Sequence, residues 1–459
     1  MLQITSGTGA RNCQGWTRRS ALKAGFLGLS GLTLADLLRL QAEGSATSTN
    51  KSVILVWLDG GPSQLESYDP KPEAPMEYRG PFGAIPTNVP GMFVSELLQR
   101  EAAHGDKMAL IRSIRHGTGD HFAGAHWMLT GRFGSTSVDL PQKYPSIGSY
   151  VSRIKGPKKA GLPAYVGLPA AESVYLYPGY QGASHLGAAY NPFDVDRANS
   201  YLHHTSNHLK IGKPACLESL TTAQADRSSS RASLLTSLDK IERAADSSRL
   251  METMDRYQQS AMSMILSGKA KDAFNLEHED PRLIDKYGDN PWGRYTLMAR
   301  RAVEAGVTFV TVDMPHWDNH SDLEKAHASN FRAMDKAVGA LIDDLEVRGM
   351  LEETLVLVMG EFGRTPRINT GQPGIPIPGR DHWGDAISVM MAGGGVRGGQ
   401  IIGATNSKAE FPIDRPLKPA DVLATVYHLL GIDYHQTFND FAGRPIPVLP
   451  EGEAIRELI

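Results

Sequence analysis

Histidine, aspartate and glutamate side chains recur directly after the apolar runs of this sequence. The members of this set are Asp59, Asp318, His320, Glu361, Asp381 and His382. Imidazole and carboxylate groups together suit zinc, manganese or iron, whereas sites built only of oxygen ligands suit magnesium or calcium. Two such ions can stabilise both the attacking and the leaving oxygen of a phosphoryl or sulfuryl displacement. The pattern therefore predicts a site for one or two divalent metal ions, with zinc or manganese expected.

A second group of polar residues follows another apolar run, Met108–Ile114. It contains His116 and His121, and histidine serves in proteins both as a metal ligand and as an acid or base. Arg364 lies three residues after Glu361, and its planar guanidinium can hold two oxygens of an anion at once. We therefore expect His121 and Arg364 to act in catalysis, and His116 and Arg364 to bind the substrate.

The elements that must position these residues follow from the spacing of apolar residues. Short, largely apolar runs at Ser52–Leu58, Met108–Ile114, 307–312 and 355–359 predict buried strands. Between the last two, residues 330–348 have apolar side chains at helical spacing, which predicts a βαβ unit. Ligands bind beyond the carboxyl ends of the strands in open α/β sheets, which is where the polar groups stand. The expected fold class is therefore α/β, with a mostly parallel central sheet.

Two other stretches receive a simpler interpretation. The pattern from Ala215 to about Phe274 is helical, and we expect a helical insertion at about 215–300 that packs beside the sheet. The acidic stretch 278–292 contains a Tyr-Gly-Asp-Asn-Pro turn and is expected to be a solvated loop.

The composition limits the class of protein and its partners. With 459 residues the chain can bury a large core, and its formal net charge of −3 gives no reason to expect nucleic acid or an anionic membrane as a partner. The two cysteines are Cys13 and Cys216, so removal of the N-terminus would leave no internal disulfide. The fold must therefore be held together by its core.

The N-terminus has the pattern of an export signal. Residues 17–23 (TRRSALK) resemble the twin-arginine motif, a mostly apolar stretch follows at 24–40, and 44–46 offers a cleavage site of small residues. The alternative is an ordinary amphipathic helix. The first interpretation predicts a twin-arginine signal peptide and linker at 1–46 and the folded domain at 47–459. It also predicts a periplasmic or extracellular protein that is not stably inserted in the membrane once the signal is cleaved.

Four short motifs together resemble a known family. They are GGPS at 60–63, WDNH at 317–320, GEFGRTP at 360–366 and GRDHW at 379–383. As a set, and over nearly the whole chain, they are similar to the family catalogued as domain of unknown function 1501. That family is placed in the alkaline phosphatase-like superfamily, with sulfatases and cofactor-independent phosphoglycerate mutases. The resemblance implies a three-layer sandwich, with a mostly parallel sheet between helices and a two-metal site at its carboxyl edge.

The resemblance also implies roles for individual positions. The aspartate that follows the first strand in the superfamily falls on Asp59. The later Asp/His ligand pair falls on Asp318 and His320, with Asp313 as a rival, and the late histidine falls on His382.

Two positions depart from the superfamily pattern. The next Asp-His pair falls on Glu361 and Phe362, so one ligand is preserved in kind and the other is missing. Sulfatases carry a Cys or Ser nucleophile about ten residues before the Thr-Gly pair that matches 130–131, and this chain has His121 in that place. His121 is therefore a candidate nucleophile, a candidate metal ligand, or a residue without a chemical role.

The expected function is metal-dependent hydrolysis of a phosphate or sulfate ester, carried by a small molecule or a polysaccharide. The alternative is a binding or scaffold protein on the same fold that has lost its chemistry, since a fold does not determine a function. The retained Asp, His and Glu positions favour the hydrolase. The missing nucleophile and the missing histidine favour the alternative.

Overall fold

Strand β1 (Ser52–Leu58) lies at the centre of the main sheet in this computed structural model, which describes residues 50–134, 143–171, 181–206 and 269–459. All seven residues of β1 are buried, as expected for a strand that is covered on both faces. It pairs in parallel with β7 (Phe309–Met314) on one side and with β8 (Thr354–Met359) on the other. The prediction that these three strands share one parallel sheet is therefore confirmed.

The remaining strands extend this sheet to eight, in the order β12-β4-β11-β8-β1-β7-β5-β6. Their bounds are Met108–Ile114 for β4, Tyr165–Leu168 for β5, Phe193–Asp194 for β6, Ile387–Gly393 for β11 and Gln400–Ile402 for β12. Among the described residues only β11 runs antiparallel to its neighbours β4 and β8. The expected α/β class with a mostly parallel sheet is thus confirmed.

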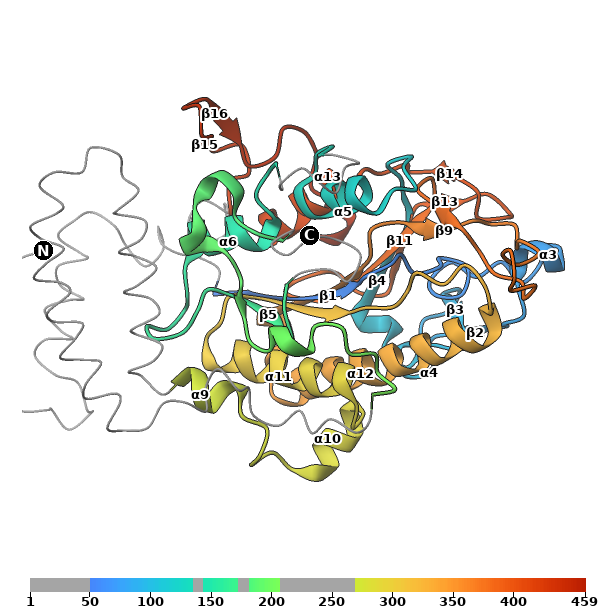
Figure 1. Cartoon of the computed structure of the whole chain (residues 1–459), viewed down its shortest axis with the longest axis horizontal. Helices are drawn as coiled ribbons and strands as arrows, with labels where there is room; N and C mark the ends of the chain where they lie inside the picture. The colour runs from blue at the N-terminus through green and yellow to red at the C-terminus, as the bar shows by residue number, and fades with distance from the viewer. Residues whose placement is uncertain (1–49, 135–142, 172–180, 207–268) are drawn as a thin grey trace, which may run out of the picture. The chain divides into compact units, whose positions relative to one another are not determined.

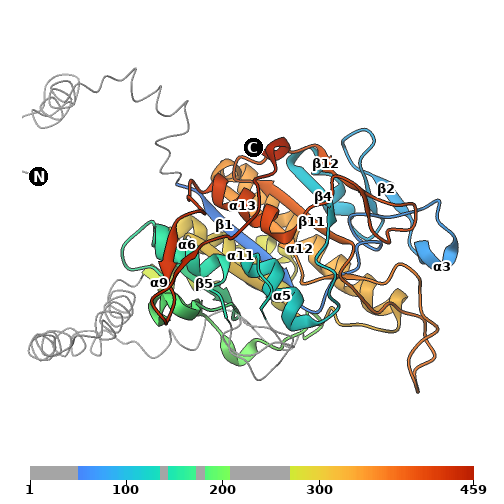
Figure 2. The same cartoon turned by 90° about the horizontal axis from the view of Figure 1, so that it is seen from above.

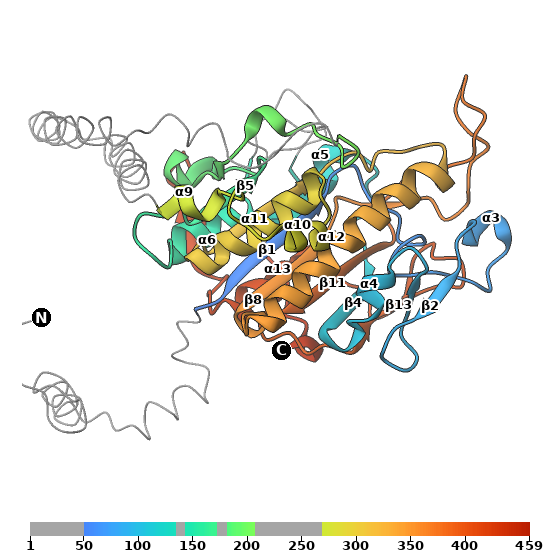
Figure 3. The same cartoon turned by 90° about the horizontal axis from the view of Figure 1, so that it is seen from below.

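Helices cover both faces of the sheet and complete three layers (Figure 1). One face carries α9 (Lys269–Phe274), α10 (Pro281–Tyr287), α11 (Pro291–Ala305) and α12 (Ala328–Val347), as Figure 3 shows. The other carries α5 (His121–Thr130), α6 (Ile147–Lys155) and α13 (Pro419–Leu429), as Figure 2 shows. Alternate β1 residues supply the two cores, with Ile54 and Val56 facing α11 and α12, and Leu55 and Trp57 facing α5 and α13.

Smaller elements lie around this sandwich. They are α3 (Met76–Arg79), β2 (Ala84–Pro86), β3 (Phe93–Ser95), α4 (Gln99–Ala102), the π-helical turn η6 (Leu323–His327), β9 (Gly363–Arg364), β10 (His382–Trp383), β13 (Ala404–Thr405), β14 (Pro412–Asp414), β15 (Thr437–Asn439) and β16 (Pro445–Pro447). The antiparallel pair β9 and β10 matters most, because it joins the segment after β8 to the segment that carries His382.

The prediction of a solvated loop at 278–292 is wrong. This stretch forms α10 and the first turn of α11. Asp280 caps α10 by accepting a hydrogen bond from the backbone N–H of Arg282, and Asn290 caps α11 by accepting one from that of Gly293. Each cap is followed by a proline at the first helical position, where the missing N–H has no cost. The residues interpreted as turn formers are therefore helix starts.

Two predictions fall outside the described residues. They are the signal peptide at 1–46 and the helical pattern between 215 and 268, and both stay predictions. Within the described ranges, no helix combines the length and the apolar character that crossing a membrane requires.

Candidate metal centre

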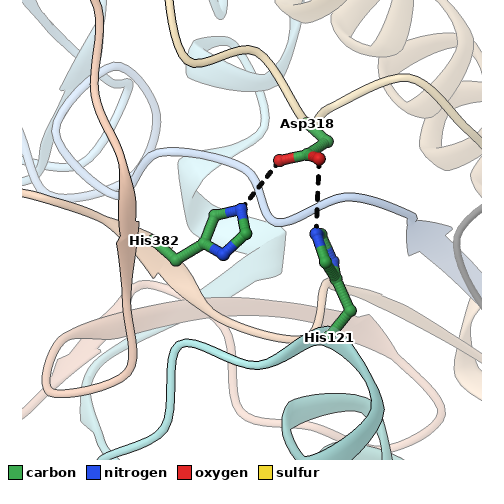
Figure 4. A group of neighbouring side chains, drawn as sticks. All are labelled: His121, Asp318 and His382. Atoms are coloured by element: carbon green, nitrogen blue, oxygen red, sulfur yellow. Dashed lines mark hydrogen bonds and ion pairs between the residues drawn. The ribbon is translucent and has the colours of Figure 1, made fainter. Parts of the chain in front are cut away.

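His121, Asp318 and His382 meet at the carboxyl edge of the sheet, each from a different segment (Figure 4). His121 is the first residue of α5, Asp318 lies in the loop after β7, and His382 begins β10. The Nε2 atom of His382 is 2.8 Å from Asp318 Oδ1, and that of His121 is 3.3 Å from Asp318 Oδ2. One candidate ligand atom from each residue lies within 4.8 Å of the other two. This spacing suits a metal bound at about 2.0–2.2 Å from each ligand.

His320 approaches the same carboxylate. Its Nε2 atom is 3.0 Å from Asp318 Oδ1, although His320 is not a member of the three-residue group. Three imidazole Nε2 atoms therefore surround one aspartate. We call His121, Asp318, His320 and His382 the imidazole cluster.

Each ring of the imidazole cluster is held at its other nitrogen. The Nδ1 atom of His382 is 2.7 Å from the carbonyl oxygen of Gly119, that of His320 is 2.7 Å from Asp381 Oδ1, and that of His121 is 2.8 Å from Glu361 Oε1. A carbonyl oxygen can only accept, so Nδ1 of His382 must carry a proton. The Nε2 atoms face the Asp318 carboxylate, which can only accept, so each donates a proton to it in this structure. Exchange of that proton for a metal would use the Nε2 lone pair while the partner at Nδ1 keeps the ring in place.

The charges of the cluster are strongly coupled. Burial lowers the pKa of His121, but its contacts with the Asp318 and Glu361 carboxylates outweigh this and raise the pKa to about 10. Burial raises the pKa of Asp318, but the hydrogen bonds from His121, His320 and His382 hold it well below its usual range. Asp318 is therefore a permanent anion among the rings, as a metal-ligating carboxylate must be.

Glu361 lies behind His121 and contacts no other ring of the cluster. Its side chain is fully buried at the end of β8, and Oε1 accepts a hydrogen bond from the backbone N–H of Gly60 at 2.8 Å as well as contacting His121. Its Oε2 atom has no hydrogen-bond partner among the described residues. In this arrangement Glu361 orients His121 through Oε1, and its predicted role as a direct ligand stays a prediction.

Gly60 allows the end of β1 to pass close to the backbone at Asp318. Its φ of +112° is in the region that favours glycine, and a Cβ atom there would lie 2.4 Å from the backbone nitrogen of Asp318. A side chain at position 60 would therefore push the Asp318 loop away from the rings.

Arg364 is enclosed directly beside Asp318. Its side chain is 0% exposed, and its N–H groups donate to the carbonyl oxygens of Gly60, Gly61 and Trp317 and to Asp318 Oδ1. These contacts connect Arg364 to the backbone around Asp318. Its predicted roles in catalysis and substrate binding stay predictions.

His116 is likewise engaged with backbone. Its Nε2 atom donates to the carbonyl oxygen of Glu361 at 2.7 Å, and its Nδ1 atom accepts from the N–H of Thr118 at 3.2 Å. Burial lowers the pKa of His116, which keeps this neutral form. Both ring nitrogens of His116 are thus bonded to backbone in this structure, and its predicted role in substrate binding stays a prediction.

The other predicted ligands lie around the cluster without joining the three-residue group. Asp59 is fully buried where β1 ends, with its backbone bonded to Met314 and Trp317, and Asp313 is buried within β7. Asp381 contacts His320 Nδ1 rather than the centre of the cluster. Of the predicted ligands, Asp318 and His382 therefore join the three-residue group and His320 approaches it.

Two residues that orient members of the cluster, Gly119 and Asn369, were not predicted from the sequence. The carbonyl oxygen of Gly119 fixes His382, and no side-chain signal reveals a carbonyl that acts in this way. Asn369 donates to Asp381 Oδ2 at 3.2 Å and to the carbonyl oxygen of His320 at 3.1 Å. The only available signal was an amide side chain in the Gly/Pro-rich loop that precedes Asp381.

Acid should destabilise the fold through three buried histidines outside the cluster. Burial lowers the pKa of His126 and His327 to about 4 and that of His204 to about 3, against about 6.5 in an unfolded chain. Because the folded-state pKa values are depressed, this stability is complete above pH 6.5 and is lost as the pH falls towards 4. In that window, each histidine lowers the free energy of unfolding by at most about 1.4 kcal/mol for each unit by which the pH falls.

Urea unfolding of metal-free protein at pH 7, 6 and 5 measures this loss. His327→Gln should flatten the dependence of the unfolding free energy on pH, whereas His428→Gln, at an exposed position of α13, should leave it unchanged. If the free energy of unfolding depends equally on pH in the wild type and in both variants, His327 does not titrate in this way.

Comparison with known proteins gives one family and a set of distant structures. A family model described as "Protein of unknown function (DUF1501)" matches residues 50–459. The comparison with curated proteins found no match.

Solved structures resemble the chain only remotely. A sulfatase from Pseudoalteromonas sp. is 13% identical, with 87% of this chain and 70% of that chain covered and a TM-score of 0.37. A protein in the alkaline phosphatase superfamily from Vibrio parahaemolyticus is 10% identical, with 83% and 67% covered and a TM-score of 0.38. A phosphonate monoester hydrolase from Silicibacter pomeroyi is 11% identical, with 88% and 76% covered and a TM-score of 0.35.

Proposed function

We propose that this chain, which belongs to the family described as protein of unknown function (DUF1501), is a metal-dependent hydrolase of phosphate or sulfate esters. The observation that carries the proposal is the convergence of three imidazole Nε2 atoms on the Asp318 carboxylate. Three imidazoles beside one carboxylate, each with its other nitrogen held by a carboxylate or a carbonyl oxygen, are the arrangement expected around a bound transition metal.

The set of donor atoms favours a transition metal, and it favours zinc over manganese. Three imidazoles and one carboxylate are ligands that zinc accepts readily, while magnesium and calcium prefer oxygen alone. His121, Asp318 and His382 would hold the ion, with His320 as the fourth candidate ligand. When bound, such an ion draws electron density from the ester oxygens and neutralises the charge that develops on them.

The chain's own groups supply orientation at this site. Glu361, Asp381 and the Gly119 carbonyl each hold one ring at Nδ1, so that the three Nε2 atoms cannot turn away from Asp318. His121 stands where sulfatases carry their nucleophile, and we assign it to the metal because both of its nitrogens already face carboxylates. Water is then the nucleophile that remains, and the reaction is a direct hydrolysis.

Metal content and hydrolysis should fall together when His382 is replaced by alanine. The purified protein should hold zinc in a fixed ratio and should cleave at least one of 4-nitrophenyl phosphate, bis(4-nitrophenyl) phosphate and 4-nitrophenyl sulfate. The variant should lose most of the metal and at least about 100-fold in rate, because it lacks one direct ligand. Elemental analysis and initial rates measure both quantities, and His428→Ala, at an exposed position, is the matched control.

His121→Ala separates the two roles that remain open for this residue. Loss of both metal and activity is expected for a ligand, whereas loss of activity with full metal content would make His121 a nucleophile. Wild-type protein that binds zinc but cleaves none of the esters would favour the alternative, a binding protein on the same fold. Wild-type protein that binds no zinc or manganese would refute the proposal.

A further inference from the structure

The loop that carries Asp318 and His320 follows β7 and contains a backbone conformation that is uncommon for its residue type. We call residues 315–320 the ligand loop. His316 has a φ of +74°, in the left-handed region that favours glycine. Such a conformation persists where surrounding contacts hold it, and it lies two residues before Asp318. The contacts that fix His316 therefore also position a candidate metal ligand.

Asn330 provides one of these contacts from α12. Its side chain is buried, and its Nδ2 group donates to the carbonyl oxygen of His316 at 2.9 Å. The Nδ2 group of Asn319, which lies within the ligand loop, donates to the same oxygen at 3.0 Å. Two donors use both lone pairs of this carbonyl. Of the two, Asn330 is the donor outside the loop, and it connects the loop to the helix layer.

His203 orients the Asn330 amide. The Nδ1 atom of His203 accepts a hydrogen bond from the backbone N–H of Thr205 at 3.2 Å, so the proton of the neutral ring is at Nε2. That Nε2 group donates to Asn330 Oδ1 at 3.0 Å. Burial lowers the pKa of His203, which favours the neutral ring. The amide oxygen of Asn330 is thereby fixed towards His203, and its NH2 group is fixed towards His316.

A second contact joins the segment that contains His203 to the ligand loop. The Nε2 group of His316 donates to the carbonyl oxygen of Tyr201 at 3.0 Å. Residues 201–205 therefore contact the ligand loop both directly and through Asn330. Both contacts end on His316, the residue with the positive φ, which indicates that they hold this conformation.

We propose that Asn330 is a positioning residue for the candidate metal centre. Its hydrogen bond to the His316 carbonyl, oriented by His203, holds the ligand loop and with it the Asp318 carboxylate. This inference rests on the proposed function and adds to it a residue that contacts neither metal nor substrate. Without the Asn330 donor the ligand loop can leave its strained conformation, and Asp318 faces the rings in a smaller fraction of the molecules. The affinity for metal then falls.

Asn330→Asp tests the proposal with little change of shape. The aspartate keeps an oxygen that accepts from His203, but it places a second oxygen, instead of a donor, against the His316 carbonyl. Zinc affinity should fall at least about tenfold, and the visible absorption bands of cobalt-substituted protein should shift because they depend on ligand geometry. Tyr287→Phe is the control, since it removes another buried hydrogen bond of α12, from the tyrosine hydroxyl to Asp344 Oδ2 at 3.0 Å. It should lower stability but leave zinc affinity and the cobalt spectrum unchanged, and equal zinc affinities in the two variants would overturn the proposal.

Two substitutions of His316 test the backbone conformation while Asn330 stays in place, so they apply even if Asn330→Asp does not fold. Asparagine enters the left-handed region readily, whereas a β-branched residue such as valine does so at a high cost. Both His316→Asn and His316→Val lack the imidazole that donates to Tyr201. The zinc affinity of His316→Val should therefore be at least about tenfold below that of His316→Asn. Equal affinities would show that the conformation at this residue does not position the metal ligands, and would overturn the proposal.

Hydrogen exchange of the metal-free full chain distinguishes this inference from the proposed function. The backbone N–H groups of Trp317 and Asn319 donate to the carbonyl oxygens of Asp59 and Trp317, respectively. Their exchange, followed by mass spectrometry of the ligand loop, should be at least about tenfold faster in Asn330→Asp than in Tyr287→Phe. Faster exchange in a protein that binds no zinc would leave the role of Asn330 in the ligand loop standing and refute the metal centre. Zinc binding and ester hydrolysis with unchanged exchange would refute the role of Asn330 alone.

Discussion

Replacing Asp318 with asparagine should abolish metal binding and ester hydrolysis together. The Asp318 carboxylate faces the Nε2 atoms of His121, His320 and His382 at 3.3, 3.0 and 2.8 Å, and Oδ1 also accepts from Arg364 at 2.9 Å. An amide has one acceptor oxygen and an NH2 group, so at least one ring would face a donor instead of an anion. We expect metal content to fall below detection after dialysis and the rate to fall by at least about 1,000-fold. The reason is that the variant loses both a ligand and the anion that faces all three rings.

The same change should lower the unfolding free energy by about 1–3 kcal/mol, because the fully buried Arg364 loses a charge-assisted hydrogen bond. Asp381→Asn is the matched control. Asp381 is 52% exposed, and the one member of the imidazole cluster that its carboxylate contacts is His320, at the outer nitrogen. An asparagine keeps an oxygen that can accept from that nitrogen. That variant should lose about 10–100-fold in metal affinity and little stability. An Asp318→Asn protein with a full complement of metal would refute the assignment of the cluster.

Replacing Arg380 with methionine should cause the largest loss of stability of any change considered. Arg380 and Glu66 are both buried, with Nη2 of the arginine 2.8 Å from Oε1 and Nε 3.0 Å from both carboxylate oxygens. Removing one partner leaves Glu66 as an unpaired buried charge, which costs about 3–5 kcal/mol. The carbonyl oxygens of Tyr78 and Thr365 lose a donor as well. Urea unfolding measures the change.

A surface pair provides the control for this prediction. Arg415→Met removes the contact with Glu457 at 2.9 Å, where the side chains are 44% and 42% exposed, and should cost less than about 1 kcal/mol. The double variant Glu66→Met with Arg380→Met should be more stable than the sum of the single changes predicts, because no charge is left unpaired. Arg380→Met should also weaken metal binding, since Arg380 directly precedes Asp381. A loss no larger than that of Arg415→Met would contradict the buried ion pair.

The main elements of the fold were predictable from local patterns. Strands β1 and β4 have the predicted bounds, Ser52–Leu58 and Met108–Ile114, because a strand covered on both faces must be apolar along its whole length. The α12 pattern succeeded for a related reason, since an amphipathic helix repeats its apolar face every three to four residues. The failure at 278–292 arose where short helices begin with Asp-Pro and Asn-Pro, pairs that serve equally well in turns.

For the candidate metal site, the residue types were predictable but their contacts were not. Which donor types follow the strands was predictable from residue order alone, because side-chain chemistry and strand ends are both local properties. Residue order could not determine which of them meet, since a difference of one residue in a loop turns a side chain from the centre of a cluster to its rim. Asp381 and His382 are neighbours in the chain, yet one faces His320 from outside and the other faces Asp318.

Backbone groups are a second reason why the contacts of the site could not be predicted from the sequence. The Gly119 carbonyl and the Gly60 amide each form hydrogen bonds that orient the cluster, and every residue carries such groups, so no residue type signals them. Burial also determines which polar side chains can be reached from solvent. Arg364 has the side chain of an anion-binding residue, but the loops at Gly60 and Trp317 close over it and take its donors. Long-range packing determines whether a residue can be a ligand, orients a ligand or fixes nearby backbone, because these roles differ by a few ångströms and not by residue type.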